Sequence, residues 1–187
     1  MKKLVLVVPF LVALITFSFA PTPTPTPAPA EGTGIKWMSL KEAQEAIKKQ
    51  PKKIFVDVYT DWCGWCKRMD ATTFQNPVIV KYVNDNFYAV KFNAESKETF
   101  QFNGKEYTYA TQGTRGYNTW ASEMLSGQLS YPTTVYLDEK LNPIFPVPGY
   151  LDPSAFETVL HYVNSDSYKS QKWEDYQGKF KGTIEQK

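Results

Sequence analysis

The sequence predicts an α/β domain in which helices flank both faces of a mixed sheet. A β-α-β succession joins strands expected over residues 53–60 and 88–93, and such a unit demands a right-handed crossover between parallel strands. Two adjacent strands follow, over 133–138 and near 144–147, and a last helix starts after them. At about 100–200 residues per domain, the length of 187 residues indicates one folded domain.

The first helix is predicted by the signals at its two ends. Glu42 follows Ser39 by three residues, which is the spacing of a capping box, and the helix ends before Pro51. Its apolar face combines Leu40, Ala43 and Ile47. The strand over 53–60 then alternates apolar side chains at Ile54, Val56 and Val58.

The middle of the chain predicts two helical stretches, a strand, a hairpin and a short helix. The first stretch runs from about Cys63 to Phe74, and the second resumes over 78–87 after the interruption at Asn76-Pro77. Beyond the strand at 88–93, Asn103-Gly104 stands between alternating aromatic and polar residues, which predicts a hairpin over 99–110. A short helix is expected over 117–126, with inward residues Trp120, Met124 and Leu125. We interpret Tyr107, Tyr109 and Trp120 as packing residues.

The last helix begins at a typical start signal, Asp152-Pro153, because Asp suits the N-cap and Pro the first turn. Its predicted buried face consists of Phe156, Val159, Leu160 and Val163. The domain is expected to cover residues 34–165, and residues 166–187 are predicted to be a polar tail.

The N-terminal residues predict export. Lys2 and Lys3 precede an apolar run over residues 4–20, so residues 1–20 are expected to be a signal peptide or a membrane anchor. Cleavage after Ala20 would leave Pro21 at the cut, so both readings stay open. The linker over 21–33 begins PTPTPTPAPA, which favours extended polyproline II. The domain is therefore expected in the periplasm or the envelope.

Composition excludes several function classes. A formal net charge of +2 offers no basic surface for nucleic acid. Two cysteines cannot form a multi-disulfide scaffold, and with the single His161 they leave a Cys/His zinc site one ligand short. No metal and no separate cofactor are expected.

The chemistry concentrates in Cys63-Gly64-Trp65-Cys66. Two cysteines at i and i+3 on the first turn of a helix can form a disulfide, and the helix N-terminus lowers the pKa of the first thiol. Gly64 lets another backbone approach, while Trp62 and Trp65 offer flat apolar surface for an extended polypeptide. Cys66 is expected to point inward and to be less accessible. An inert brace is disfavoured because so short a loop stabilises little; a metal half-site shared by two chains is the other alternative.

These residues, within DVYTDWCGWCK, resemble the thioredoxin family over about residues 35–165. The resemblance implies that Asp57 is the buried carboxylate beneath Cys66 and that Lys91 supports it from the adjacent strand. It also implies that Tyr131-Pro132 forms the cis-proline loop facing the disulfide. Gly149 matches the glycine before the last helix. Plainer interpretations stay open for three of these residues. Asp57 could be a satisfied polar group of the core, Lys91 an exposed strand residue and Pro132 an ordinary trans turn residue. The residues around 97–128 depart from the family's simplest members.

The resemblance and the residues together predict a thiol–disulfide oxidoreductase whose only redox group is the Cys63–Cys66 pair. Cys63, Cys66 and Asp57 are the expected catalytic residues. A reductant is favoured because Trp65 brings no charge, and its partners would be protein disulfide substrates and a membrane electron donor. No separate dimerisation domain is seen, so a monomer is expected. An oxidase, an isomerase and a non-catalytic binding module of the same fold remain open.

Overall fold

The computed structural model describes residues 34–185, so the predicted signal or anchor and the whole predicted linker over 21–33 lie outside the described residues. In chain order the elements are β1 Trp37–Met38, α1 Leu40–Lys49, β2 Lys53–Tyr59, α2 Gly64–Ala71, η1 Thr73–Gln75, α3 Pro77–Asn86, β3 Phe87–Asn93, β4 Phe100–Phe102, β5 Lys105–Tyr107, β6 Tyr109–Gln112, β7 Arg115–Asn118, α4 Thr119–Met124, β8 Thr133–Leu137, β9 Pro143–Pro148, α5 Pro153–Asn164, η2 Ser167–Lys169 and α6 Trp173–Gln177.

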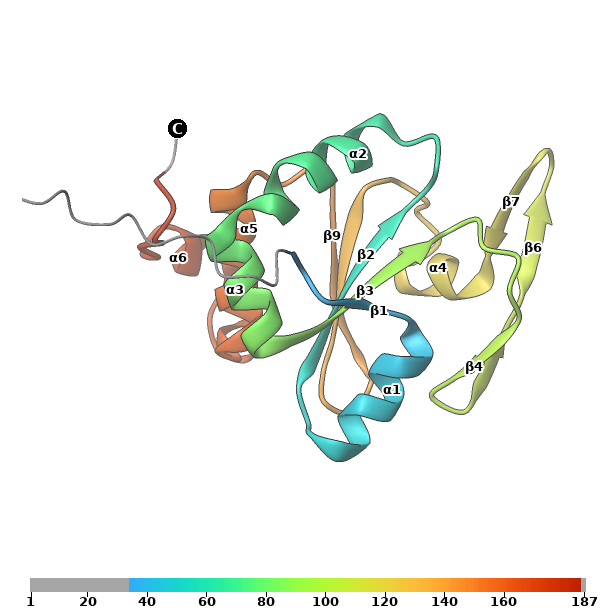
Figure 1. The fold of residues 1–187 in the computed structure, drawn as a ribbon, viewed down its shortest axis with the longest axis horizontal. Coiled ribbons are helices and arrows are strands. Elements are labelled where there is room, and N and C mark those ends of the chain that lie inside the picture. Colours follow the sequence, from blue (N-terminus) through green and yellow to red (C-terminus); the bar gives the residue numbers. More distant parts are fainter. Residues whose placement is uncertain (1–33, 186–187) are drawn as a thin grey trace, which may run out of the picture. The chain divides into compact units, whose positions relative to one another are not determined.

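A mixed sheet in the order β1-β3-β2-β8-β9 forms the centre of the domain (Figure 1). Strand β2 pairs parallel to β3 and antiparallel to β8, which confirms the predicted parallel β-α-β pair and mixed sheet. Asp57 is in register with Lys91 on one side and with Thr134 on the other. The carboxylate and the lysine to which the resemblance assigns a role therefore lie side by side on adjacent strands.

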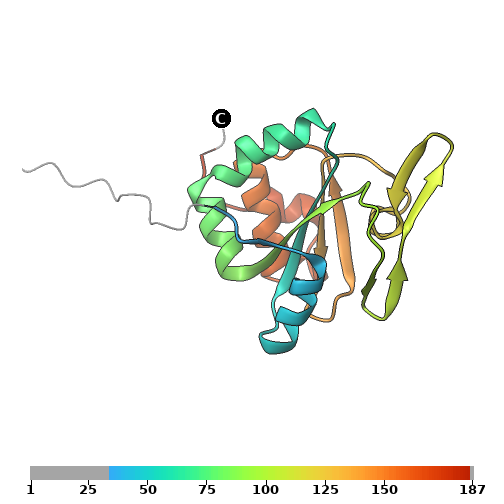
Figure 2. The same cartoon turned by 45° about the vertical axis from the view of Figure 1, so that its right-hand side comes forward.

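Helices cover both faces of the sheet, as predicted (Figures 1 and 2). Side chains alternate along β2, so Ile54 and Val56 pack with α1 and α4, whereas Phe55 packs with α2, α3 and α5. Asp57 lies two residues after Phe55, so its side chain is on the same face of the sheet as that of Phe55, which is the face covered by α2. That alternation alone directs the buried carboxylate toward the helix that carries the cysteines.

The predicted local signals operate as hydrogen-bonding caps. Ser39 and Glu42 form the capping box of α1, and Asp152 caps α5. Asn76, predicted only as part of an interruption between helices, is the N-cap of α3. The predicted inner faces of α1 and α5 are confirmed at Leu40 and Ala43 and at Phe156, Val159, Leu160 and Val163, all of which are buried.

The segment between β3 and β8 contains two hairpins where the sequence predicted one. Asn103 and Gly104 form the predicted turn between β4 and β5, with φ of 49° and 76°. A second hairpin, β6–β7, turns at Gly113 and was missing from the prediction. Helix α4 follows it, and the expected interior positions of Trp120, Met124 and Leu125 are confirmed.

The polar C-terminal segment after residue 165 packs against the domain. Tyr162 of α5 contacts the rings of Trp173 and Tyr176 at centroid distances of 5.3 and 4.9 Å. The buried Glu157 carboxylate accepts backbone hydrogen bonds from Thr183 and Ile184 at 2.8 and 3.0 Å. Apolar and polar contacts thus join this segment to the domain. Across residues 34–185, no helix combines the length and the apolar character needed to cross a bilayer.

Candidate active site

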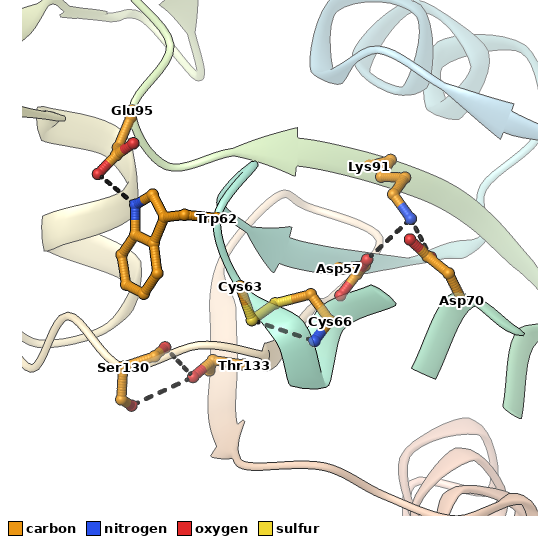
Figure 3. The surroundings of a disulfide bond; sticks show 9 residues. All are labelled: Asp57, Trp62, Cys63, Cys66, Asp70, Lys91, Glu95, Ser130 and Thr133. Carbon is orange, nitrogen blue, oxygen red and sulfur yellow. Dashed lines mark hydrogen bonds and ion pairs between the residues drawn. A yellow bond between two sulfur atoms is a disulfide. The ribbon is translucent and has the colours of Figure 1, made fainter. Parts of the chain in front are cut away.

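Cys63 and Cys66 form a disulfide at the start of α2 (Figure 3). Their sulfur atoms are 2.10 Å apart and their Cα atoms 5.3 Å apart. Cys63 is the N-cap of the helix, and its Sγ accepts the backbone N–H of Cys66 at 3.0 Å. An N–H group that a helix end leaves without a backbone partner is therefore directed at the first sulfur. In the reduced protein the same group stabilises a Cys63 thiolate.

The two cysteines differ in their polar contacts rather than in their burial. Cys63 is 4% exposed and Cys66 is 3% exposed, so both are buried in the disulfide form and the expected difference in their accessibility is small. Figure 3 shows the Asp57 carboxylate on the Cys66 side of the pair. The asymmetry that sorts attacker from resolver therefore lies in the N–H group at Cys63 and the carboxylate behind Cys66.

Asp57 is the buried acid that the resemblance implies. It is 1% exposed, its Oδ2 is 3.4 Å from Lys91 Nζ, and its Oδ1 has no hydrogen-bond partner among the described residues. Burial raises the pKa of the Asp57 carboxyl to about 7, against the attraction of the Lys91 ammonium, which lowers it. A carboxyl with this pKa exchanges its proton near neutral pH, which suits a general acid or base.

Lys91 also forms an ion pair with Asp70 of α2, a residue that was not among the predicted site residues. Asp70 lies four residues after Cys66 and therefore on the same side of α2, and this spacing is the signal by which it could have been found.

Two exposed tryptophans flank the disulfide, as predicted. Trp62 is 63% exposed and Trp65 is 58% exposed. The indole N–H of Trp62 donates to Glu95 Oε1 at 3.0 Å. No sequence signal pointed to Glu95, which is brought to Trp62 only by the turn after β3.

Trp65 belongs to a cluster with two residues that sequence reasoning missed. Its ring lies 5.5 Å from that of Tyr150, and the Arg68 guanidinium lies over both rings at 5.6 and 5.8 Å. Gly64 is exposed, with nothing near the space a side chain would occupy, so the surface above the pair is open.

The loop before β8 forms the opposite wall of the site. The Tyr131–Pro132 peptide bond is cis, and the Pro132 carbonyl accepts the backbone N–H of Gly149 at 2.8 Å. Tyr131 packs edge-on against Trp62, with ring centroids 5.9 Å apart. Burial and the nearby Glu95 carboxylate raise the pKa of Tyr131 to about 12, so its hydroxyl stays protonated. A groove of about 260 Å³ between the walls is lined by Trp65, Tyr131, Pro132, Gly149 and Tyr150.

The disulfide, the two tryptophans and the Tyr131–Pro132 loop therefore meet beyond the carboxyl end of β2, while Asp57 is buried within β2 and Lys91 lies beside it on β3. Among the described residues, no group of three His, Cys, Asp or Glu side chains is arranged to hold a metal ion. The site thus combines a disulfide at the N-terminus of α2 with the buried Asp57 carboxyl of β2, an arrangement suited to redox chemistry.

The sequence model of the Thioredoxin-like domain family matches residues 40–164. The chain belongs to this family. The fold and the Cys63–Cys66 pair together support thiol–disulfide oxidoreductase chemistry.

Solved structures share the fold. The chain resembles DsbH Oxidoreductase with a TM-score of 0.54 and 15% identity, over 78% of this chain and 95% of that one. It resembles a candidate disulphide-isomerase from Bacteroides thetaiotaomicron with a TM-score of 0.52 and 25% identity, over 74% of this chain and 98% of that one.

Curated relatives are much longer proteins. Spermatogenesis-associated protein 20 of Rattus norvegicus is 30% identical over 137 residues, which cover 71% of this chain and 16% of the relative. An uncharacterised protein of Caenorhabditis elegans is 28% identical over 131 residues, again covering 16% of its length. The chain thus spans about one-sixth of these relatives.

Proposed function

We propose that this protein reduces disulfide bonds in other proteins by thiol–disulfide exchange in the cell envelope. The observation that carries the proposal is the position of Cys63 Sγ, which accepts the Cys66 N–H at the N-terminus of α2, while the buried Asp57 lies on the Cys66 side of the pair. One sulfur is equipped to attack, and the other has a base to deprotonate it.

The reaction follows from this geometry. The Cys63 thiolate attacks a substrate disulfide and forms a mixed disulfide, releasing the first substrate thiolate. Asp57 accepts the proton of the Cys66 thiol, directly or through water. The Cys66 thiolate then attacks Cys63 Sγ, which breaks the mixed disulfide and releases the second substrate thiolate. The protein gives up two electrons and ends in the disulfide state of Figure 3.

The substrate polypeptide binds between the two aromatic walls. Trp65 and Tyr150 line one side of the groove, and Tyr131 and Pro132 line the other. The backbone next to the cis bond pairs with an extended substrate chain by strand addition. Apolar contact and backbone pairing give recognition without a large charge, in keeping with the near-neutral composition.

Three features favour a reductant that works outside the cytoplasm. Trp65 brings no positive charge between the cysteines, whereas strong oxidants depend on a heavily stabilised thiolate. The charged and apolar start of the sequence favours export or anchoring. A reductant in that compartment needs electrons from a membrane donor, which the Pro/Thr-rich linker would allow the domain to reach. We propose that the domain acts as a monomer.

Substitution of the resolving cysteine tests the mechanism. Cys66→Ser should accumulate mixed disulfides with substrate proteins through Cys63, visible on non-reducing gels, and Cys63→Ser is the matched control that should form none. If Cys66→Ser forms no mixed disulfide with any disulfide substrate offered, exchange through Cys63 is refuted.

The candidate disulphide-isomerase among the structural relatives favours isomerisation as the second candidate function. The reduction potential separates the alternatives: a value well below about −220 mV supports a reductase, and one near −120 mV an oxidase. An isomerase would reshuffle a scrambled disulfide protein without net reduction. A binding module of the same fold would keep a reactive Cys63 but fail to reduce insulin-like substrates.

A further inference from the structure

In the proposed mechanism, the proton of the Cys66 thiol moves to the Asp57 carboxyl, which has no direct contact with bulk water. Asp57 is 1% exposed and lies under α2, so a proton taken from Cys66 is shielded from bulk water. The residue must lose that proton before the next cycle. Two tyrosines also lie near this carboxylate. The fully buried Tyr136 on β8 offers no route to the surface, and burial raises the pKa of the half-buried Tyr59, so its hydroxyl keeps its own proton.

The charged contacts of Asp57 lead outward. Its Oδ2 is 3.4 Å from Lys91 Nζ, and the same nitrogen contacts Asp70 Oδ1 (Figure 3). Side-chain exposure rises along this series from 2% for Asp57 to 26% for Lys91 and 40% for Asp70. The three groups therefore form a line from the interior to solvent, and they come from three different elements, β2, β3 and α2.

Aromatic rings hold the ammonium of Lys91 in the middle of this line. Its Nζ lies 5.3 Å from the ring centroid of Trp37, 5.2 Å from that of Tyr59 and 5.7 Å from that of Phe74. Ring faces attract a cation but are poor hydrogen-bond acceptors compared with a carboxylate. Lys91 donates a hydrogen bond to Asp70 and forms an ion pair with Asp57, so one nitrogen contacts both carboxylates, which is the arrangement that a proton transfer between them requires.

We propose that Asp57, Lys91 and Asp70 form a proton path, with Asp70 as its solvent end. Asp57 takes the proton of the Cys66 thiol. Lys91 then accepts that proton from Asp57 as it passes one of its own to Asp70, so the lysine is an ammonium before and after the step. Asp70 releases the proton to water and becomes a carboxylate again. Asp70 is thus a positioning and relay residue that acts through Lys91 and touches neither substrate nor sulfur. The inference rests on the proposed function.

The test compares sulfur chemistry with proton release in single turnovers. Reduced full-length protein is mixed with an excess of a disulfide peptide. Tryptophan fluorescence follows formation of the Cys63–Cys66 disulfide, and a pH-indicator dye follows the proton. Asp70→Asn should slow proton release and turnover by about five- to tenfold, a part of what general acid–base catalysis contributes. A small diffusible base, imidazole, should restore the rate.

Two further variants make the result specific. Asp70→Glu keeps a carboxylate within reach of Lys91 and should behave like the wild type. Asp85→Asn removes an exposed carboxylate of α3 that pairs with Lys81, and should change nothing. Thermal unfolding checks that Asp70→Asn is folded.

The outcomes separate this proposal from the proposed function. If the wild type exchanges disulfides and Asp70→Asn releases its proton at the wild-type rate, the path is refuted and the oxidoreductase stands. A slow Asp70→Asn that imidazole does not restore also refutes the path, because the defect is then structural. If the wild type itself exchanges no disulfide, the proposed function fails.

Discussion

The backbone N–H of Cys66 donates a hydrogen bond to Sγ of Cys63, with 3.0 Å between the nitrogen and the sulfur. The resolving cysteine thus supports its partner through the main chain. Substitution of the Cys66 side chain leaves this donor in place, so the reactivity of Cys63 can be measured without disulfide formation.

In Cys66→Ser, the pKa of the Cys63 thiol should fall below the value of about 8.5 for a free cysteine, because the helix N-terminus stabilises the thiolate. Iodoacetamide at pH 7 should then alkylate Cys63 about tenfold faster than a free cysteine. The matched variant Cys63→Ser should react slowly through Cys66. A midpoint of alkylation at or above about 8.5 in Cys66→Ser would show that the capping hydrogen bond has no effect on reactivity.

Asp57 should make the oxidised protein less stable as the pH rises. Burial raises the pKa of its carboxyl from 3.8 to about 7, so between these pH values the folded state keeps a proton that the unfolded chain has lost. The contribution to stability is complete below about pH 4 and is lost as the pH rises through about 7. Asp57→Asn removes this dependence and should raise the free energy of unfolding at pH 8 by up to about 4 kcal/mol.

Urea denaturation of the oxidised protein at pH 4 and pH 8 measures the effect. Asp85→Asn, at an exposed site, is the control and should leave the pH dependence intact. Equal stabilities of the wild type and Asp57→Asn at pH 8 would contradict a raised pKa. Asp57→Asn should also slow disulfide formation, so stability and activity are expected to change in opposite directions at this residue.

The sequence predicted those features that depend on local chemistry. The capping box at Ser39, the helix interruption at Asn76-Pro77, the N-cap at Asp152 and the turn at Asn103-Gly104 each involve residues within a few positions of one another. Cys63 and Cys66 are equally local. The resemblance added Asp57, whose burial the structure shows directly.

The features that escaped prediction depend on contacts between distant residues. Asp70 meets Lys91 across 21 positions of sequence, and Trp62 reaches Glu95 across 33. Strand β1 has two residues, too few for any periodicity. The C-terminal segment appears polar in sequence but is held by Glu157, which its own sequence does not reveal.

The tryptophans should matter for protein substrates and not for small disulfides. Trp62→Ala and Trp65→Ala remove exposed apolar surface beside the pair, so the KM for a reducible protein should rise about tenfold, the effect of a moderate interface residue. The rate with a small disulfide should change less than about twofold. Trp62→Phe keeps an aromatic ring but loses the indole N–H that donates to Glu95. Its KM should lie between those of the wild type and Trp62→Ala. Equal losses for both substrate classes would place the defect in the chemistry.

The β6–β7 hairpin depends on one close approach. A Cβ atom placed on Gly116 would overlap the ring and hydroxyl of Tyr109, which lies two residues before Thr111, the register partner of Gly116. The Tyr109 side chain would therefore have to leave its position. Gly116→Ala should therefore destabilise the domain by about 1–3 kcal/mol, the usual cost of overpacking. Tyr109→Ala removes the obstacle, so Gly116→Ala should cost much less in that background. The double-mutant cycle is measured by urea denaturation. Additive losses would mean that Tyr109 does not set the requirement for glycine, and that another feature of β7 excludes a side chain there.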